Sequence, residues 1–276
     1  MRELLNEVAS LCRQAGGLIA DIYQRSEQAP IDVVIKSDHS PLTQADLLAH
    51  DCLVEGLAKL LPAVPILSEE GEIPPLAERK QWNEFWLVDP LDGTREFIHR
   101  TGDFTVNVAL IRNHKPVLGV VYAPMSATLY SAINAQSSED GAFKHHQQHI
   151  EPLKVAECLK HQQALRIVTS RRHGVDALKG LMESLSDKTP IAEQVAVGSS
   201  LKHCLVAEGR ADFYPRFGLT SQWDTAAAQA IVEAAGGFVV DRQWQPLSYQ
   251  QRESVLNPEF YVLGDSVAAW RALVDG

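Results

Sequence analysis

Two aspartates at the end of an apolar run are the residues best suited to chemistry in this sequence. Residues 86–94, WLVDPLDGT, read as a buried strand that ends in Asp89 and Asp92, followed by Gly93 and Thr94. Because a strand end fixes side-chain direction, both carboxylates can be aimed at one point, where their repulsion requires a cation. Oxygen ligands without thiolates favour a hard ion such as Mg²⁺. The glycine lets backbone N–H groups approach an anion, and the threonine can hold a water. These residues predict metal-assisted phosphate chemistry.

Further acidic residues lie where secondary-structure elements are expected to begin or end. Glu69 and Glu70 follow a short extended segment; a solvated turn is the alternative interpretation. Asp46 fits a capping box with Thr43. It could also accept a hydrogen bond from a catalytic hydroxyl or water, and both roles can hold, since a helix N-terminus favours anions. Asp224 opens an alanine-rich helix, where an aspartate is ordinarily a cap. The helix start would also hold this carboxylate rigidly, as a functional site requires.

Cations and small hydroxyls occur together in three later segments. They are SRRH at 170–173, GSSLK at 198–202 and YPR at 214–216, each at the end of an expected strand or the start of an expected helix. Such positions favour a second phosphate, and polar surface loops are the alternative. The histidine run at 145–149 has no cysteine or acidic partner at ligand spacing, so it is expected to be a solvated loop and not a metal site.

Hydrophobic periodicity predicts the elements that position these residues. Helices are expected at 3–24 and 43–61, an extended segment at 65–68, a loop at 72–84, and strands of a largely antiparallel sheet at 85–88, 104–111, 117–122 and 128–132. A polar stretch at 134–164 suggests a boundary between an α+β lobe, 1–150, and an α/β lobe, 151–276. In the second lobe, strands at 166–169, 191–197, 212–214, 238–240 and 261–263 alternate with helices at 176–186, 199–208 and 225–235. Such alternation favours helices layered on a sheet.

Composition restricts the classes of protein and of partner. The 276 residues are 45% hydrophobic and 22% charged, which suits one large domain or two lobes. A net charge of −10 argues against general affinity for nucleic acid or anionic membranes, but not against one small anionic ligand. The four cysteines are far apart and are expected to be reduced packing thiols. Neither a signal peptide nor an apolar run of about 18 residues is present, so a cytoplasmic protein is expected. Oligomeric state and peripheral contact with the cytoplasmic face of the inner membrane stay open.

Taken together, the motifs resemble those of the inositol monophosphatase superfamily over nearly the whole chain. They are IKSDHSPLTQAD, ILSEEGE, WLVDPLDGTREF and WDTAAAQAIVEAAGG, in the family's order. Within the superfamily, DPLDGTREF, GSSLK, YPRFG and SRRH are most similar to the 3′(2′),5′-bisphosphate nucleotidases of the CysQ type. The resemblance implies an αβαβα layered sandwich of the inositol-monophosphatase/fructose-bisphosphatase-like kind, two or three Mg²⁺ ions and sensitivity to lithium. Two departures are Ala228, where the family pattern has glycine, and Arg95, where lysine is common.

The same resemblance implies a role for each site residue. Glu69, Asp89 and the Leu91 carbonyl would bind one ion, and Asp89, Asp92 and Asp224 a second, with Glu69, Leu91, Asp92 and Asp224 also contacting substrate. Thr94, paired with Asp46, would orient and deprotonate the attacking water, while the N–H groups of Gly93 and Thr94 hold the scissile phosphate. Contacts to a nucleotide are implied for His173, Ser199, Lys202 and Arg216.

The main hypothesis is therefore hydrolysis of the 3′-phosphate of adenosine 3′,5′-bisphosphate to AMP and phosphate, in sulfur assimilation and nucleotide recycling. An inositol-1-monophosphatase or related sugar phosphatase would share the metal site and differ in the second lobe. A metal-binding regulatory protein without catalysis is the non-enzyme alternative. Whether 2′,5′ isomers or sulfated nucleotides are also substrates stays open.

Overall fold

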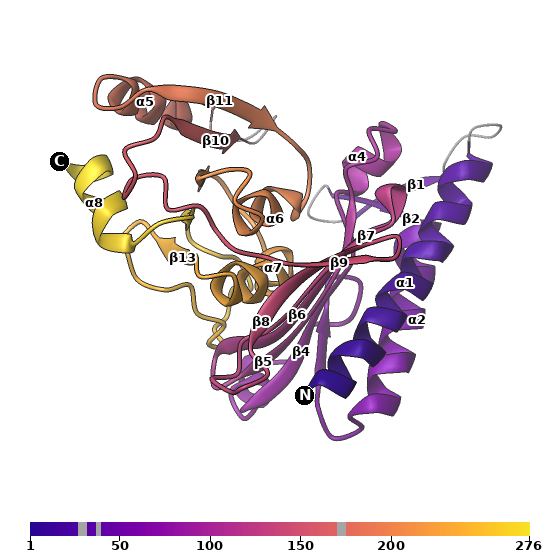
Figure 1. Cartoon of the computed structure of the whole chain (residues 1–276). Coiled ribbons are helices and arrows are strands. Elements are labelled where there is room, and N and C mark those ends of the chain that lie inside the picture. The colour runs from indigo at the N-terminus through magenta and orange to yellow at the C-terminus, as the bar shows by residue number, and fades with distance from the viewer. Residues whose placement is uncertain (27–31, 37–39, 170–174) are drawn as a thin grey trace.

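Five layers of secondary structure form the molecule, and they alternate between helices and sheets. The computed structural model describes residues 1–26, 32–36, 40–169 and 175–276. From right to left in Figure 1, two long helices, a seven-stranded sheet, two central helices, a five-stranded sheet and two outer helices follow one another. This arrangement confirms the αβαβα sandwich expected from the sequence.

The first helical layer covers one face of the larger sheet. It consists of α1 (Arg2–Arg25) and α2 (Gln44–Leu60), close to the bounds predicted from periodicity. The buried face of α1 carries Val8, Cys12, Ala15 and Ile19, at the spacing of a single helical stripe. Thr43 caps α2 in a capping box with Asp46. The same pair of hydrogen-bonded residues therefore fixes the start of this helix and the position of the Asp46 carboxylate.

The seven-stranded sheet is antiparallel except at one pair. Its order is β3-β4-β5-β6-β7-β8-β9, and only β3 and β4 pair in parallel within it. The strands are β3 (Ile66–Ser68), β4 (Glu84–Asp92), β5 (Thr105–Arg112), β6 (Lys115–Ala123), β7 (Thr128–Ile133), β8 (Gly141–His146) and β9 (His149–Pro152). The first five match the predicted extended segments, and the largely antiparallel sheet is confirmed.

The prediction for the histidine run was wrong in its local structure. Residues 141–152 form the hairpin of β8 and β9 and not an irregular connector. His145 and His146 lie on β8, and their partners lie on the neighbouring strand β7. The His145 ring is 2.8 Å from Ser131 Oγ, and the His146 ring is 3.1 Å from Thr128 Oγ1. The polar sequence concealed this hairpin because its side chains are satisfied by hydrogen bonds to the neighbouring strand and not by an apolar face.

The central layer consists of α7 (Gln222–Ala234) and α6 (Leu201–Ala207), and α7 lies very close to the larger sheet. A Cβ atom on Gly119 of β6 would stand 2.3 Å from the Ala227 carbonyl oxygen, so only glycine allows this approach. Ala228 is fully buried in the same helix. The alanine-rich sequence of α7 is therefore explained by packing against the sheet, which also fixes the helix start that carries Asp224.

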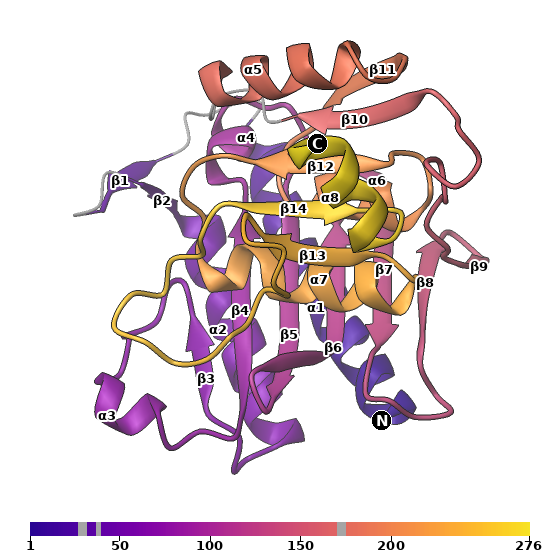
Figure 2. The ribbon, with the colours of Figure 1, turned by 90° about the vertical axis from the view of Figure 1, so that its left-hand side faces the viewer.

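The second sheet is smaller and mixed, and Figure 2 shows it in front of α7. Its order is β11-β10-β12-β14-β13, with β10 (Leu165–Thr169), β11 (Ile191–Ala196), β12 (Phe213–Arg216), β13 (Phe238–Asp241) and β14 (Phe260–Leu263). The outer helices are α5 (Val175–Ser186) and α8 (Val267–Asp275). The predicted alternation of strands and helices is confirmed, whereas α8 was missed.

Several short elements were also missed because they hold too few residues for a periodic pattern. They are β1 (Val33–Ile35), β2 (Pro41–Thr43), α3 (Leu76–Arg79), α4 (Thr94–Ile98) and a 3₁₀ turn, Pro124–Ser126. The predicted loop at 72–84 thus contains α3. Among the described residues, every helix is too short or too polar to cross a membrane. The division into lobes at residue 150 stays a prediction; that position falls within β9.

Candidate functional site

The end of β4 holds the two aspartates in a bulge. Asp89 pairs with Asn107 and Asp92 with Thr105 on β5, so the register shifts between the two aspartates. Within the bulge, the Leu91 N–H donates to Asp89 Oδ1 at 3.1 Å. Gly93 then turns the chain into α4 with φ of +97°, and a Cβ atom there would lie 3.2 Å from the Asp103 carbonyl oxygen. A glycine is therefore required directly after the carboxylates.

Four carboxylates from three segments are electrostatic neighbours at this place. Burial raises the pKa of Asp89 well above its ordinary value, and the charges of Glu69, Asp92 and Asp224 raise it further. Burial also raises the pKa of Asp224, with Asp92 and Glu69 as the next causes. The end of β3, the end of β4 and the start of α7 thus converge, as the sequence motifs implied, and their mutual repulsion favours either protons or a bound cation.

Each carboxylate also has hydrogen bonds of its own. Asp92 Oδ2 accepts from the Ser200 N–H at 2.7 Å and from Ser199 Oγ at 2.8 Å. Asp224 Oδ2 accepts from the Ser221 N–H at 2.9 Å. Within the described parts of the chain, no three His, Cys, Asp or Glu side chains form a ready-made metal site. These hydrogen bonds hold the carboxylates of Asp92 and Asp224 on donors of the chain itself.

Glu69 meets a cation of the chain itself. Lys36 Nζ lies 3.3 Å from Glu69 Oε1 and 2.6 Å from Glu70 Oε1. Burial raises the pKa of Glu69, while the Lys36 charge opposes that rise. An ammonium group beside two of the acidic residues shows that this place attracts positive charge, which fits the hard oxygen-donor set predicted from the sequence.

Asp46 has both of the roles that its sequence position allows. Its Oδ2 accepts from the Thr43 N–H at 2.7 Å and from Thr43 Oγ1 at 2.6 Å, which completes the helix cap. Its Oδ1 accepts from Thr94 Oγ1 at 3.1 Å. Burial raises the pKa of this carboxyl, and hydrogen bonds from Thr43 and Thr94 partly offset the rise. The pair joins the start of α2 to Thr94, the first residue of α4.

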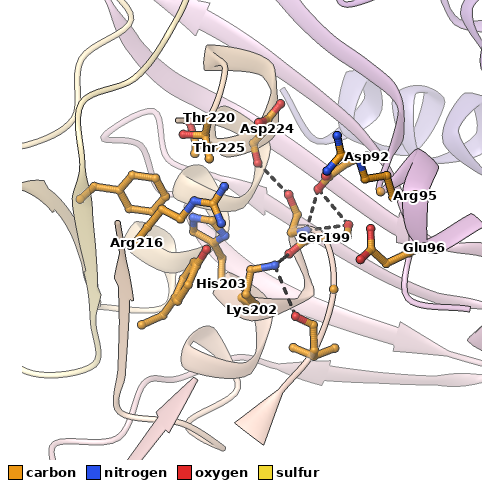
Figure 3. A pocket seen from close by; sticks show the side chains of 16 residues that line it. Asp92, Arg95, Glu96, Ser199, Lys202, His203, Arg216, Thr220, Asp224 and Thr225 are labelled. Carbon is orange, nitrogen blue, oxygen red and sulfur yellow. Dashed lines mark hydrogen bonds between the residues drawn. The ribbon is translucent and has the colours of Figure 1, made fainter. Parts of the chain in front are cut away.

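A cavity begins at the carboxylates and continues toward two cations, as Figure 3 shows. Its far part is lined by Ser199, Lys202 and His203 of the 198–203 segment and by Arg216 at the end of β12. Lys202 and Arg216 are each only 8% exposed. Because the Arg216 charge lowers the pKa of Asp224, this cation also acts on the carboxylate end. One cavity therefore places a strongly acidic end beside a cationic end.

The segment of Ser199 is fitted closely against the chain just before β5. A Cβ atom on Gly198 would lie 2.6 Å from the Asp103 carbonyl oxygen, so only glycine permits this contact. Ser199, predicted to contact a nucleotide, lines the cavity, and its hydroxyl donates to Asp92. Lys202 donates to the Ser199 carbonyl at 2.7 Å. His173 of the SRRH segment lies outside the described residues.

Sequence analysis missed two residues that complete this region. Asn107 on β5 donates to Asp92 Oδ2 at 3.3 Å and to Ser200 Oγ at 3.0 Å, and His203 lies in the cavity wall. An asparagine within the largely apolar run at 104–111 was the available signal for Asn107. No comparable signal identified His203, because one histidine beside Lys202 within an expected helix does not reveal that its ring is buried.

Comparison with known proteins identifies the family of this chain. The family model described as "Inositol monophosphatase family" matches residues 1–270. The chain belongs to the inositol monophosphatase family. Among curated members, the 3′(2′),5′-bisphosphate nucleotidase CysQ of Escherichia coli (strain K12) is 46% identical over 94% of this chain and 99% of its own length. The protein of the same name from Haemophilus influenzae is 39% identical over 98% and 96%.

Solved structures of the inositol monophosphatase family share the fold. CysQ from Bacteroides thetaiotaomicron matches with a TM-score of 0.79 and 38% identity, over 96% of this chain and 97% of that one. An IMPase from Thermotoga maritima matches with a TM-score of 0.77 and 25% identity, over 100% and 99%. Family members with different names therefore share the fold of this chain.

Proposed function

We propose that this chain is a Mg²⁺-dependent 3′(2′),5′-bisphosphate nucleotidase that hydrolyses the 3′-phosphate of adenosine 3′,5′-bisphosphate to AMP and phosphate. The observation that carries the proposal is the single cavity in which Asp92 and Asp224 face Lys202 and Arg216. A substrate with a scissile phosphate and a second phosphate matches both ends. The names of relatives with 39% and 46% identity support it. A role in sulfur assimilation, a cytoplasmic location and any oligomeric state stay predictions.

The acidic end fits divalent metal ions by its chemistry. Its donors are carboxylate and carbonyl oxygens, and the raised pKa of Asp89 reflects crowded negative charge. Glu69, Asp89 and the Leu91 carbonyl would hold one Mg²⁺, and Asp89, Asp92 and Asp224 another. When bound, such ions lower the pKa of a water and neutralise charge on the attacking and leaving oxygens.

The chain's own groups supply the positioning. The N–H groups of Gly93 and Thr94 hold the scissile phosphate, where α4 begins. Thr94 Oγ1 accepts a hydrogen bond from the attacking water and passes a proton to Asp46 Oδ1, to which it already donates at 3.1 Å. The new P–O bond forms as the bond from phosphorus to the ribose oxygen breaks, and the ribose oxygen takes a proton from solvent. Phosphoryl transfer requires little more than this positioning and charge neutralisation.

The cationic end determines which phosphate ester is chosen. Lys202 and Arg216 are largely withdrawn from water, and an anion that reaches them gains charge-assisted hydrogen bonds. A bisphosphate can use both ends of the cavity at once, whereas a monophosphate uses only the acidic end. Binding energy at the second phosphate thereby orients the first.

Phosphate release with Mg²⁺ from adenosine 3′,5′-bisphosphate and from inositol 1-phosphate, at equal concentrations, tests the proposal. A strong preference for the nucleotide is expected, together with loss of rate at millimolar Li⁺ as the family resemblance implies. A preference for inositol 1-phosphate would replace the nucleotidase by an inositol phosphatase with the same acidic end. Mg²⁺ binding without phosphate release would indicate a regulatory protein.

A further inference from the structure

His203 presents an unusual combination of burial and unused polarity. It is 3% exposed, and neither ring nitrogen has a hydrogen-bond partner. The ring is stacked on Phe260, with centroids 5.6 Å apart and planes at 27°, and meets Tyr214 edge-on at 5.3 Å. Figure 3 shows it in the cavity wall between Lys202 and Arg216. An aromatic hydrocarbon ring would fill the same space without leaving two polar atoms unsatisfied.

The imidazole is neutral in these surroundings. Burial lowers the pKa of His203 from 6.5 to about 3, and the charges of Lys202 and Arg216 act in the same direction. A neutral imidazole carries one N–H donor and one acceptor nitrogen. It therefore differs from its two cationic neighbours in what it can recognise, because one nitrogen can donate to an acceptor and the other can accept from a donor.

Buried polar atoms without partners destabilise a folded protein. Such a cost at a cavity wall is explained if a ligand supplies the missing partners. A phosphate oxygen, which is purely an acceptor when ionised, suits Lys202 and Arg216. The nucleoside part of a nucleotide offers paired donors and acceptors, either on the edge of its base or on a ribose hydroxyl.

We infer that His203 is a specificity-determining residue that pairs with the nucleoside part of the substrate, beside the second-phosphate position of Lys202 and Arg216. This inference rests on the proposed nucleotidase function and adds recognition of the neutral part of the ligand. Polar atoms left unsatisfied in the free protein are satisfied in the complex. His203 thus lowers the stability of the free protein but allows it to discriminate among ligands.

His203→Phe tests this inference, since phenylalanine keeps the packing on Phe260 and Tyr214 and removes both nitrogens. The melting temperature of the free variant is expected to rise by about 2–4 °C. Its KM for adenosine 3′,5′-bisphosphate is expected to rise about tenfold with kcat within twofold of wild type. Its rate on 4-nitrophenyl phosphate, which lacks a nucleoside, is expected to stay unchanged. A purely structural role predicts instead a lower melting temperature and an unchanged KM.

Two analogues identify which part of the nucleoside is read. If His203 pairs with the 2′-hydroxyl, 2′-deoxyadenosine 3′,5′-bisphosphate should show the raised KM with wild-type protein, and the variant should not distinguish it from the ribonucleotide. If the base edge is read, uridine 3′,5′-bisphosphate should show this behaviour instead. Wild-type protein that treats all three bisphosphates alike would overturn the inference.

Controls separate this inference from the proposed function. His161→Phe, at a solvent-exposed histidine, should alter neither the KM nor the melting temperature. His203→Leu provides a second variant without ring nitrogens, and its KM should rise as in His203→Phe. If wild-type protein hydrolyses no nucleotide, the proposed function fails; the same bisphosphates are then compared by the rise in melting temperature that each produces. An equal rise in wild type and His203→Phe would refute the role of His203.

Discussion

The carboxylates of Asp92 and Asp224 line one end of the cavity, with Glu69 and Asp89 as their electrostatic neighbours, and Lys202 and Arg216 line the other end. The acidic end has raised pKa values at Asp89 and Asp224 because burial and like charges act together. At the cationic end, Lys202 donates to a backbone carbonyl and lies 5.7 Å from the Tyr214 ring centroid. In the proposed function, the first end holds cations and the second receives an anion. This difference indicates that the chemistry and the choice of substrate are carried by separate groups.

Asp92→Asn should have the largest effect on this comparison, because it removes a negative charge from the acidic end. We expect kcat to fall by more than about 100-fold, since even outer partners of metal ligands account for 10–100-fold. Steady-state phosphate release at saturating Mg²⁺ measures it, and circular dichroism checks the fold. Asp51→Asn, at an exposed aspartate of α2, is the matched control. Near wild-type turnover by a folded Asp92→Asn protein would remove the two-ion assignment.

Thr94→Val tests the water-positioning pair beside the acidic end. Loss of the hydroxyl that donates to Asp46 should lower kcat by roughly 100-fold and change KM little, as for other general acid–base groups. Thr94→Ser keeps the hydroxyl and should recover most of the rate. Single-turnover kinetics at fixed Mg²⁺ would show whether the chemical step is the one affected. Equal rates for valine and serine would exclude a role for the hydroxyl.

Lys202→Ala changes the cationic end alone. KM for the bisphosphate should rise about 10–100-fold, because hydrogen bonds to charged groups contribute about 1.5–3 kcal/mol. Hydrolysis of inositol 1-phosphate should be almost unaffected. Lys160→Ala, at an exposed lysine paired with Glu157, serves as control for loss of charge. Parallel losses on both substrates would show that the two ends are not separable.

The pH dependence of stability tests the neutral ring between the two cations. His203 has a folded-state pKa of about 3, below its ordinary 6.5, so the unfolded chain binds a proton there and the folded protein does not. Protonation of the unfolded chain at His203 does not affect stability above pH 6.5. It lowers the free energy of unfolding as the pH falls from 6.5 toward 3. Urea unfolding of wild type and His203→Phe should therefore diverge below pH 6.5, by at most about 1.4 kcal/mol per pH unit. Other titrating groups are common to both proteins, and a constant difference between pH 7.5 and 4.5 would contradict a neutral buried imidazole.

Local sequence patterns predicted those elements whose formation depends on a few neighbouring residues. The stripe of Val8, Cys12 and Ala15 predicted α1, and the Thr43 cap predicted the start of α2. The apolar run before Asp89 predicted β4, and the glycines after α7 marked its end. The αβαβα class followed from the motifs through a family resemblance. The β8–β9 hairpin was missed because its histidines are satisfied across the sheet, which a polar sequence does not reveal.

By itself, the sequence determined which carboxylates, hydroxyls and cations are available and which element ends carry them, since turns, caps and strand ends depend on a few neighbouring residues. Only the tertiary structure decided their partners. Thr94 meets Asp46 across 48 positions, and Ser199 meets Asp92 across 107. The orphaned nitrogens of His203 appear only once β12 and β14 enclose the ring. Such contacts depend on how separate elements pack, and periodicity within one helix or strand carries no information about that packing.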